Sequence, residues 1–171
     1  MYASDMCQPL LYGMSDSLSP AIGFNWGATN YDRVKKIAKC NFIGSCVVSF
    51  IATAVMFFFS GTVAALFVDA EETRLLTLAT RALRLFCLAY LFRWFSIAAQ
   101  SFLSAIEKPL PATVLSVCVA LVFPVLMLGA LWNLGLDGIW LNMLGTSVLA
   151  GILALFLILH VLRGIKKNRN K

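Results

Sequence analysis

The chain has 171 residues, of which 60% are hydrophobic and 13% charged, and its mean hydropathy is +0.84. A water-soluble domain of this size cannot bury so much apolar material, which excludes a soluble globular protein. The net charge is +6, and the basic residues that produce it are grouped beside the apolar segments. We therefore expect membrane lipid as the surroundings and no nucleic-acid partner.

Five segments are apolar over the roughly 20 residues that a helix needs to cross a bilayer core. They predict an all-α fold, a multi-pass transmembrane helical bundle that occupies residues 1–171 as one unit. The five expected spanning helices cover about residues 3–28, 42–68, 82–106, 110–132 and 138–162. A basic cytoplasmic tail is expected at residues 163–171.

Basic residues are concentrated at alternate junctions between the expected helices. Several lie between Arg33 and Lys39 after the first segment, Lys108 lies between the third and fourth segments, and the tail is rich in Lys and Arg. The junctions after the second and fourth segments carry acidic residues, such as Glu71 and Asp137. Because cytoplasmic loops are enriched in Lys and Arg, we expect a cell-membrane protein with its N-terminus outside and its C-terminus in the cytoplasm.

The first expected helix has small, acidic and proline residues at alternating steps of four and three. They are Asp5, Pro9, Gly13, Asp16, Pro20, Gly23 and Gly27. This spacing puts them on one helix face, as in the wall of a polar pathway. Asp16 is the main pathway candidate, Asp5 lies nearer the outer interface, and Asn25 at the inner end is a pathway candidate or an interface anchor. Pro9 and Pro20 are expected to bend the helix.

A second polar stripe follows on the third expected helix at steps of three and four residues. Its members are Tyr90, Arg93, Ser96, Gln100 and Ser104. Asp16 and Arg93 lie about midway along their helices, so we expect them to approach each other directly or through water. In one interpretation they line the pathway, where an unpaired Asp16 could carry a proton. In the other, they form a fixed ion pair that holds two helices together.

The fourth expected helix contains Pro124, which predicts a kink. The five cysteines are scattered without a CxxC pair and are typical of small buried hydrophobic residues. The sequence has no combination of residues that is typical of nucleophilic catalysis, metal ligation or phosphate binding. We therefore expect neither an enzyme nor a metal site.

Three stretches together resemble the multidrug and toxic compound extrusion (MATE) family. The first is QPLLYGMSDSLSPAIGFNWGA at residues 8–28, followed by NYDRVKK at residues 30–36. The second is SAIEKPLPA at residues 104–112 and the third is GLDGIW at residues 135–140. They occur in the same order as similar stretches of the family, and the resemblance extends over nearly the whole chain.

The resemblance implies a fragment of a two-lobed transporter with twelve helices, this chain corresponding to about helices eight to twelve in the C-terminal lobe. The complete transporter would exchange organic, often cationic, compounds for Na⁺ or H⁺ by alternating access. The coupling ion would be its only cofactor, and the helices of the N-terminal lobe would be the partner. This chain alone is expected to be inactive. The alternatives are a related flippase for lipid-linked oligosaccharides and a non-transporting membrane fragment or subunit.

Overall fold

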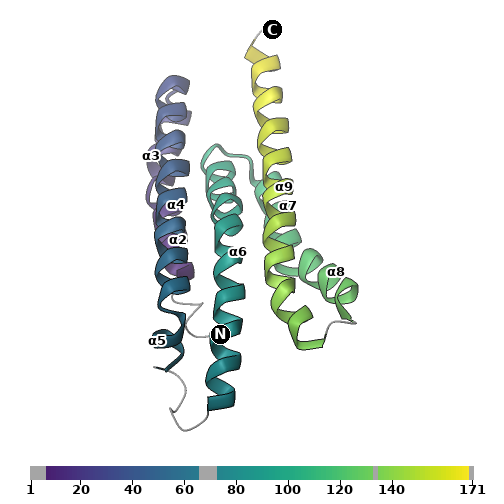
Figure 1. Ribbon diagram of the computed structural model, residues 1–171. Coiled ribbons are helices and arrows are strands. Elements are labelled where there is room, and N and C mark those ends of the chain that lie inside the picture. Colours follow the sequence, from purple (N-terminus) through teal and green to yellow (C-terminus); the bar gives the residue numbers. More distant parts are fainter. Residues whose placement is uncertain (1–6, 66–72, 133–134, 170–171) are drawn as a thin grey trace.

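A computed structural model describes residues 7–65, 73–132 and 135–169 of the chain. Every regular element in these ranges is a helix, which confirms the predicted all-α bundle (Figure 1). In chain order the elements are α2 (Cys7–Ser17), α3 (Ser19–Gly27), α4 (Tyr31–Phe58), α5 (Ser60–Ala65), α6 (Thr73–Ala105), α7 (Pro109–Val117), the π-helix η1 (Cys118–Val122), α8 (Phe123–Ala130) and α9 (Gly135–Arg169).

The long helix α6 lies at the centre of the bundle, between α4 and α9 (Figure 1). α2 and α3 contact both α4 and α6, and α8 packs against α9. Buried side chains form three clusters, each of which includes residues of α6. Representative members are Leu11 with Tyr90, Ile22 with Leu103, and Ala99 with Ala154. α6 therefore holds the N-terminal and C-terminal helices together.

Four stretches of the described chain are helical, long and apolar enough to cross a membrane. They are Tyr31–Phe58, Thr77–Ala105, Pro109–Ala130 and Leu141–Arg163. The expected first span instead consists of α2 and α3, which are separated at Leu18. Pro20, two residues further on, has no N–H to donate to the carbonyl of Asp16. The described helices thus include four continuous spans and one polar segment divided in two.

The expected second span begins earlier in the structure than its apolar composition indicated. α4 starts at Tyr31 rather than near residue 42, so the basic residues of the first expected junction belong to the spanning helix itself. Asn30 stands at the N-cap position but makes no side-chain capping bond. Hydrophobicity alone could not locate this boundary, because a helix continues through basic residues wherever its hydrogen bonds continue.

The surface of the bundle has many exposed apolar side chains. Phe58 is 81% exposed, Leu110 79% and Phe24 77%. A water-soluble monomer rarely exposes large apolar side chains over so much of its surface. Hydrocarbon chains of a bilayer are the surroundings in which these side chains are stable.

Candidate functional site

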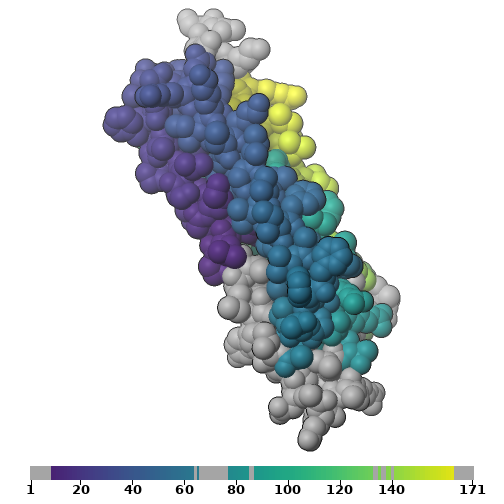
Figure 2. All heavy atoms as spheres, turned by 60° about the vertical axis from the view of Figure 1, so that its left-hand side comes forward, coloured from purple at the N-terminus to yellow at the C-terminus, as the bar shows by residue number. Residues whose placement is uncertain are grey.

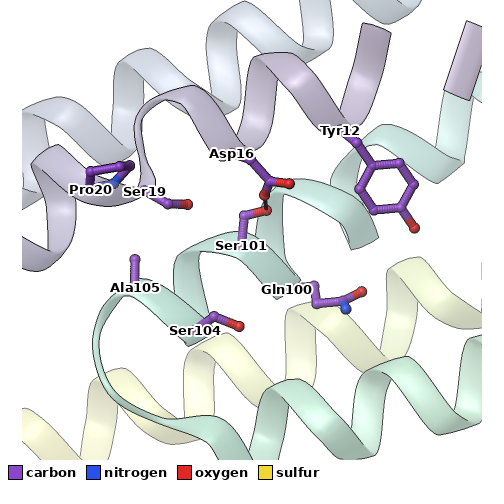
Figure 3. Close-up of a pocket in the computed structure, with 8 residues that line it drawn as sticks. All are labelled: Tyr12, Asp16, Ser19, Pro20, Gln100, Ser101, Ser104 and Ala105. Atoms are coloured by element: carbon purple, nitrogen blue, oxygen red, sulfur yellow. Dashed lines mark hydrogen bonds between the residues drawn. The ribbon is translucent and has the colours of Figure 1, made fainter. Parts of the chain in front are cut away.

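A pocket of about 490 Å³ lies between the α2–α3 pair and the C-terminal half of α6 (Figure 3). Its lining residues are Tyr12, Asp16, Ser19, Pro20, Gln100, Ser101, Ser104 and Ala105. Most of them bear a hydroxyl, amide or carboxyl group. Asp16 is the charged residue of this lining. Two of the predicted pathway residues, Asp16 and Gln100, therefore meet at one pocket.

The interruption between α2 and α3 shapes one wall of the pocket. Leu18 separates the two helices, with φ −94° and ψ −8°. Pro20 lies in the first turn of α3, where its missing N–H is tolerated. Asp16 consequently lies in the last turn of α2 and Ser19 in the first turn of α3, and both line the pocket.

The Asp16 carboxylate in the last turn of α2 makes this wall electronegative. The negative C-terminal end of the α2 dipole and the positive N-terminal end of the α3 dipole meet here and offset each other, so the carboxylate supplies the net charge. The structure has no ion pair between Asp16 and a basic side chain of the described residues. The wall therefore favours a cation over an anion.

Ser101 of α6 donates a hydrogen bond to Oδ1 of Asp16 (Figure 3). Ser101 is buried, whereas Asp16 is exposed to the pocket. A hydroxyl that donates to a carboxylate makes a charge-assisted bond, which is stronger than a neutral one. This bond connects α2 to α6 and orients the carboxylate.

Two further side chains supply polar atoms beside the carboxylate. Nε2 of Gln100 donates to Oγ of Ser116 on α7 at 3.0 Å, which connects the pocket to the C-terminal helices. Oγ of Ser19 is buried and has no partner among the described residues. Buried hydroxyl groups normally have a hydrogen-bond partner. Oγ of Ser19 is thus a polar atom of a pocket-lining residue that the described residues leave unsatisfied.

Among the described residues, Arg93 makes no ion pair with Asp16, so the direct form of the predicted approach is not seen, and an approach through water stays a prediction. Arg93 precedes Ser101, the partner of Asp16, by eight residues, or about 12 Å along α6. Nε of Arg93 is buried without a partner among the described residues. α2 and α3 are together shorter than α6 and pack along its C-terminal half, where Ile22 shares a cluster with Ile106, and this places Asp16 beside Ser101.

Three further candidates, Tyr90, Ser96 and Asn25, make local contacts outside the pocket. Tyr90 is buried in the cluster that contains Leu11. Oγ of Ser96 donates to the carbonyl of Arg93 at 2.8 Å, and Nδ2 of Asn25 donates to the carbonyl of Ala21 at 2.8 Å. These bonds stay within one helix, so they satisfy the buried polar groups without forming a site. Asp5 lies outside the described residues.

The three prolines occupy different positions in their helices. Pro9 is in the first described turn of α2, and Pro20 is in the first turn of α3. Pro124 follows the π-helix η1, in which the N–H of Phe123 donates to the carbonyl of Cys118, five residues earlier. Since Pro124 has no N–H, the carbonyl of Ala120 cannot receive its usual bond from residue 124.

Sequence reasoning missed a buried polar row on α4. Its members are Asn41, Ser45, Ser49 and Thr53, at steps of four residues. Nδ2 of Asn41 donates to the carbonyl of Ser15 at 3.3 Å, and the hydroxyls of Ser15 and Ser45 lie 3.1 Å apart. The regular step of four could have revealed this row. Nothing comparable pointed to Tyr12, Ser19 or Ser101, which join the pocket only through packing.

Comparison with known proteins identifies the family. The family model described as MatE matches residues 6–129, which is more than half of the chain and includes the helices that line the pocket. Searches of curated proteins and of solved structures found no match. MatE proteins are transporters rather than enzymes, and the four helices that could span a membrane suit a multi-pass transporter. The chain therefore belongs to the MatE family of membrane transporters.

Proposed function

We propose that the chain is part of a secondary active exporter that exchanges organic, often cationic, compounds for Na⁺ or H⁺. The observation that supports this proposal best is the polar pocket in which Asp16 supplies the charge. A cation in the pocket would meet the carboxylate and several hydroxyl oxygens. Each of these groups attracts positive charge, whether it belongs to an organic compound or to the coupling ion.

Tyr12 suits the same class of compound. It lines the pocket beside Asp16, one helical turn earlier on α2 (Figure 3). An aromatic ring attracts a cation through the negative potential of its face. A carboxylate and an aromatic ring together favour an organic cation over a neutral solute of the same size.

The electrostatics of the pocket also favour an exporter of cations over a flippase for lipid-linked oligosaccharides. A pyrophosphate group needs several cationic partners. Arg93 is the basic residue expected deep in a helix, and it lies outside the pocket lining. The carboxylate of Asp16 would repel the phosphates.

In this proposal the N-terminus faces outside and the C-terminus faces the cytoplasm, as the distribution of basic residues predicts. The transport cycle would rock this lobe against N-terminal-lobe helices, which would form the opposite wall of the cavity. The α2–α3 pair, the C-terminal half of α6 and the pocket between them would then face that cavity. The chain alone should give cells no protection against a toxic cationic dye.

Binding of ethidium to the purified chain tests the proposal through fluorescence anisotropy. We expect Asp16→Asn to weaken binding roughly tenfold, or about 1.4 kcal/mol. This lies within the attraction of up to about 4 kcal/mol between two charges about 4 Å apart at an effective dielectric constant of about 20. Asp32→Asn is the matched control. It removes the same charge from an exposed position on α4 that is 92% accessible and lies outside the pocket lining.

The control variant should bind ethidium as the native chain does. Fluorescein, an anionic dye of similar size, should not bind to the pocket. Equal effects of the two substitutions, or tighter binding of fluorescein than of ethidium, would contradict the proposal. Circular dichroism and the thermal midpoint of both variants would show whether a loss of binding reflects a loss of fold.

A further inference from the structure

The outward face of α4 changes character along the helix. Its first turns carry exposed basic residues, Arg33, Lys36 and Lys39. Further along, the same face carries apolar side chains that are about half exposed: Ile43 is 54% exposed, Val47 51% and Phe50 57%. We call these six residues the α4 strip. The strip is basic at one end and apolar at the other.

The α4 strip lies on the opposite side of the helix from the buried polar row. Steps of three and four residues connect its members, so they share one face. The residues Val34, Ala38 and Asn41 alternate with the strip in sequence, but they are buried and point toward the bundle. Figure 2 shows α4 along the front of the molecule, uncovered by other described helices. The strip is therefore a surface that the described fold leaves open.

The basic end of the strip has no acidic partner within the described chain. The ion pair on the first turns of α4 joins Lys35 to Asp32 at 3.7 Å. Neither Lys36 nor Lys39 lies within ion-pair distance of a carboxylate of a described residue. Two cations are thus exposed without compensation just before the helix becomes apolar.

The dimensions of the strip match those of one membrane leaflet. From Lys39 to Phe50 the helix rises by about 16 Å, at 1.5 Å per residue. Half of a bilayer hydrocarbon core measures about 15 Å. A lipid whose phosphate lies beside Lys36 and Lys39 could therefore extend one acyl chain past Ile43 and Val47 to Phe50.

We propose that the α4 strip binds an anionic glycerophospholipid, with its phosphate at Lys36 and Lys39 and an acyl chain along Ile43, Val47 and Phe50. Charge complementarity selects this occupant. A zwitterionic lipid would bring its own ammonium group to the lysines, and a free phosphate would leave the apolar half of the strip unused. Basic side chains near a membrane surface attract anionic lipid by about fivefold each.

Native mass spectrometry of the full chain in detergent tests the proposal. Phosphatidylglycerol and phosphatidylcholine with identical acyl chains are added at equal concentration. We expect the native chain to retain one phosphatidylglycerol in preference to phosphatidylcholine by at least about fivefold. Equal retention of the two lipids by the native chain overturns the proposal without any variant.

Two double variants then locate the site. Lys36→Gln with Lys39→Gln should lower phosphatidylglycerol binding roughly 25-fold, about fivefold for each lysine, and leave phosphatidylcholine binding unchanged. Lys36→Arg with Lys39→Arg should keep it. The matched control, Lys35→Gln with Lys108→Gln, removes two positive charges outside the strip and should bind as the native chain does. An equal loss in the control would mean that binding depends only on overall charge, which overturns the assignment.

Competition distinguishes the lipid from its headgroup and from other occupants. Glycerol 3-phosphate at millimolar concentration should not displace the lipid, because it lacks the acyl chain. Displacement by glycerol 3-phosphate would show an anion site without lipid specificity. A dimer mass without bound lipid, lost on Val47→Ser, would show that a second copy covers the strip. Either result overturns the proposal.

Discussion

α4 and α9 flank the central helix α6 on two sides (Figure 1), and they use their buried hydroxyl groups differently. On α4, Oγ of Ser49 donates to the carbonyl of Tyr90 on α6 at 2.7 Å. On α9, Oγ of Ser147 donates to the carbonyl of Met143 at 2.8 Å, four residues earlier on the same helix. Both serines are buried. The same residue type thus connects two helices on one side and stays within its own helix on the other.

The α9 side of α6 differs from the α4 side in its packing of small side chains. Where α9 meets α6, fully buried alanines such as Ala99 and Ala154 belong to one cluster. Small side chains let helix backbones approach closely, so dispersion between the two helices stabilises this contact. Helices in a membrane have no hydrophobic driving force toward one another. The comparison teaches that α6 is held by a hydrogen bond between helices on the α4 side and by close packing of small side chains on the α9 side.

The largest expected effect comes from enlarging a residue in the α6–α9 contact. Ala154→Leu places three extra carbons where the native side chain is fully buried. We expect the free energy of unfolding to fall by about 1–3 kcal/mol, because overpacking forces side chains and backbone apart. Unfolding in mixed micelles with increasing SDS measures the change.

Ala54→Leu is the matched control for this substitution, since Ala54 is exposed on α4. It should change the free energy of unfolding by no more than about 0.5 kcal/mol. If both substitutions cost the same, close approach does not stabilise the α6–α9 contact.

A smaller effect tests the hydrogen bonds directly. Ser49→Ala should lower the free energy of unfolding by about 0.6 kcal/mol, the average for a hydrogen bond between membrane helices. Ser147→Ala removes the same atom from an equally buried site but breaks only a bond within α9. We expect it to be nearly neutral, because such bonds back to the helix carbonyl add little to stability. SDS titration of both variants measures the difference, and equal losses would remove the contrast between α4 and α9.

Much of the fold could be predicted from the sequence, because its signals are local. The runs without charged residues predicted the apolar spans, and Pro109 stands at the start of α7 as its missing N–H allows. The start of α4 was harder to predict from the sequence. Its basic first turns resemble a junction in composition, and continuous backbone bonding decides that they are helical.

The pocket was only partly predictable, since its residues come together through packing between distant segments. Asp16 and Gln100 were identifiable because polar groups inside a spanning helix are rare and costly. The partner of Asp16 was not, because its identity depends on how far α2 lies along α6. Contacts such as that of Ile22 with the end of α6 decide this position. If α2 were displaced by two turns along α6, Asp16 would lie beside Arg93 instead of Ser101. No local sequence pattern indicates where along α6 the helix packs.

The smallest effect compares two methionine–glycine contacts, one on each side of α6. A Cβ added to Gly44 would lie 2.2 Å from Cε of Met14 and 3.7 Å from its Sδ. A Cβ added to Gly145 would lie 2.1 Å from Cε of Met127 and 3.1 Å from its Sδ. In the first case a terminal methyl group has to move, whereas in the second the sulfur has to move as well.

We therefore expect Gly44→Ala and Gly145→Ala to differ in sign. Alanine is favoured over glycine in a helix by about 0.8–1 kcal/mol, which exceeds the cost of moving one methyl group of Met14, so Gly44→Ala should stabilise the fold by about 0.3 kcal/mol. At Gly145 the displaced sulfur should reverse the balance, for a loss of about 0.3 kcal/mol. A double-mutant cycle with Met127→Ala checks the cause, because Gly145→Ala should become favourable once the long side chain is gone. If Gly145→Ala is destabilising in both backgrounds, the cost does not arise from Met127. The close approach of α6 and α9 at Ala154 would then extend along α9 as far as Gly145.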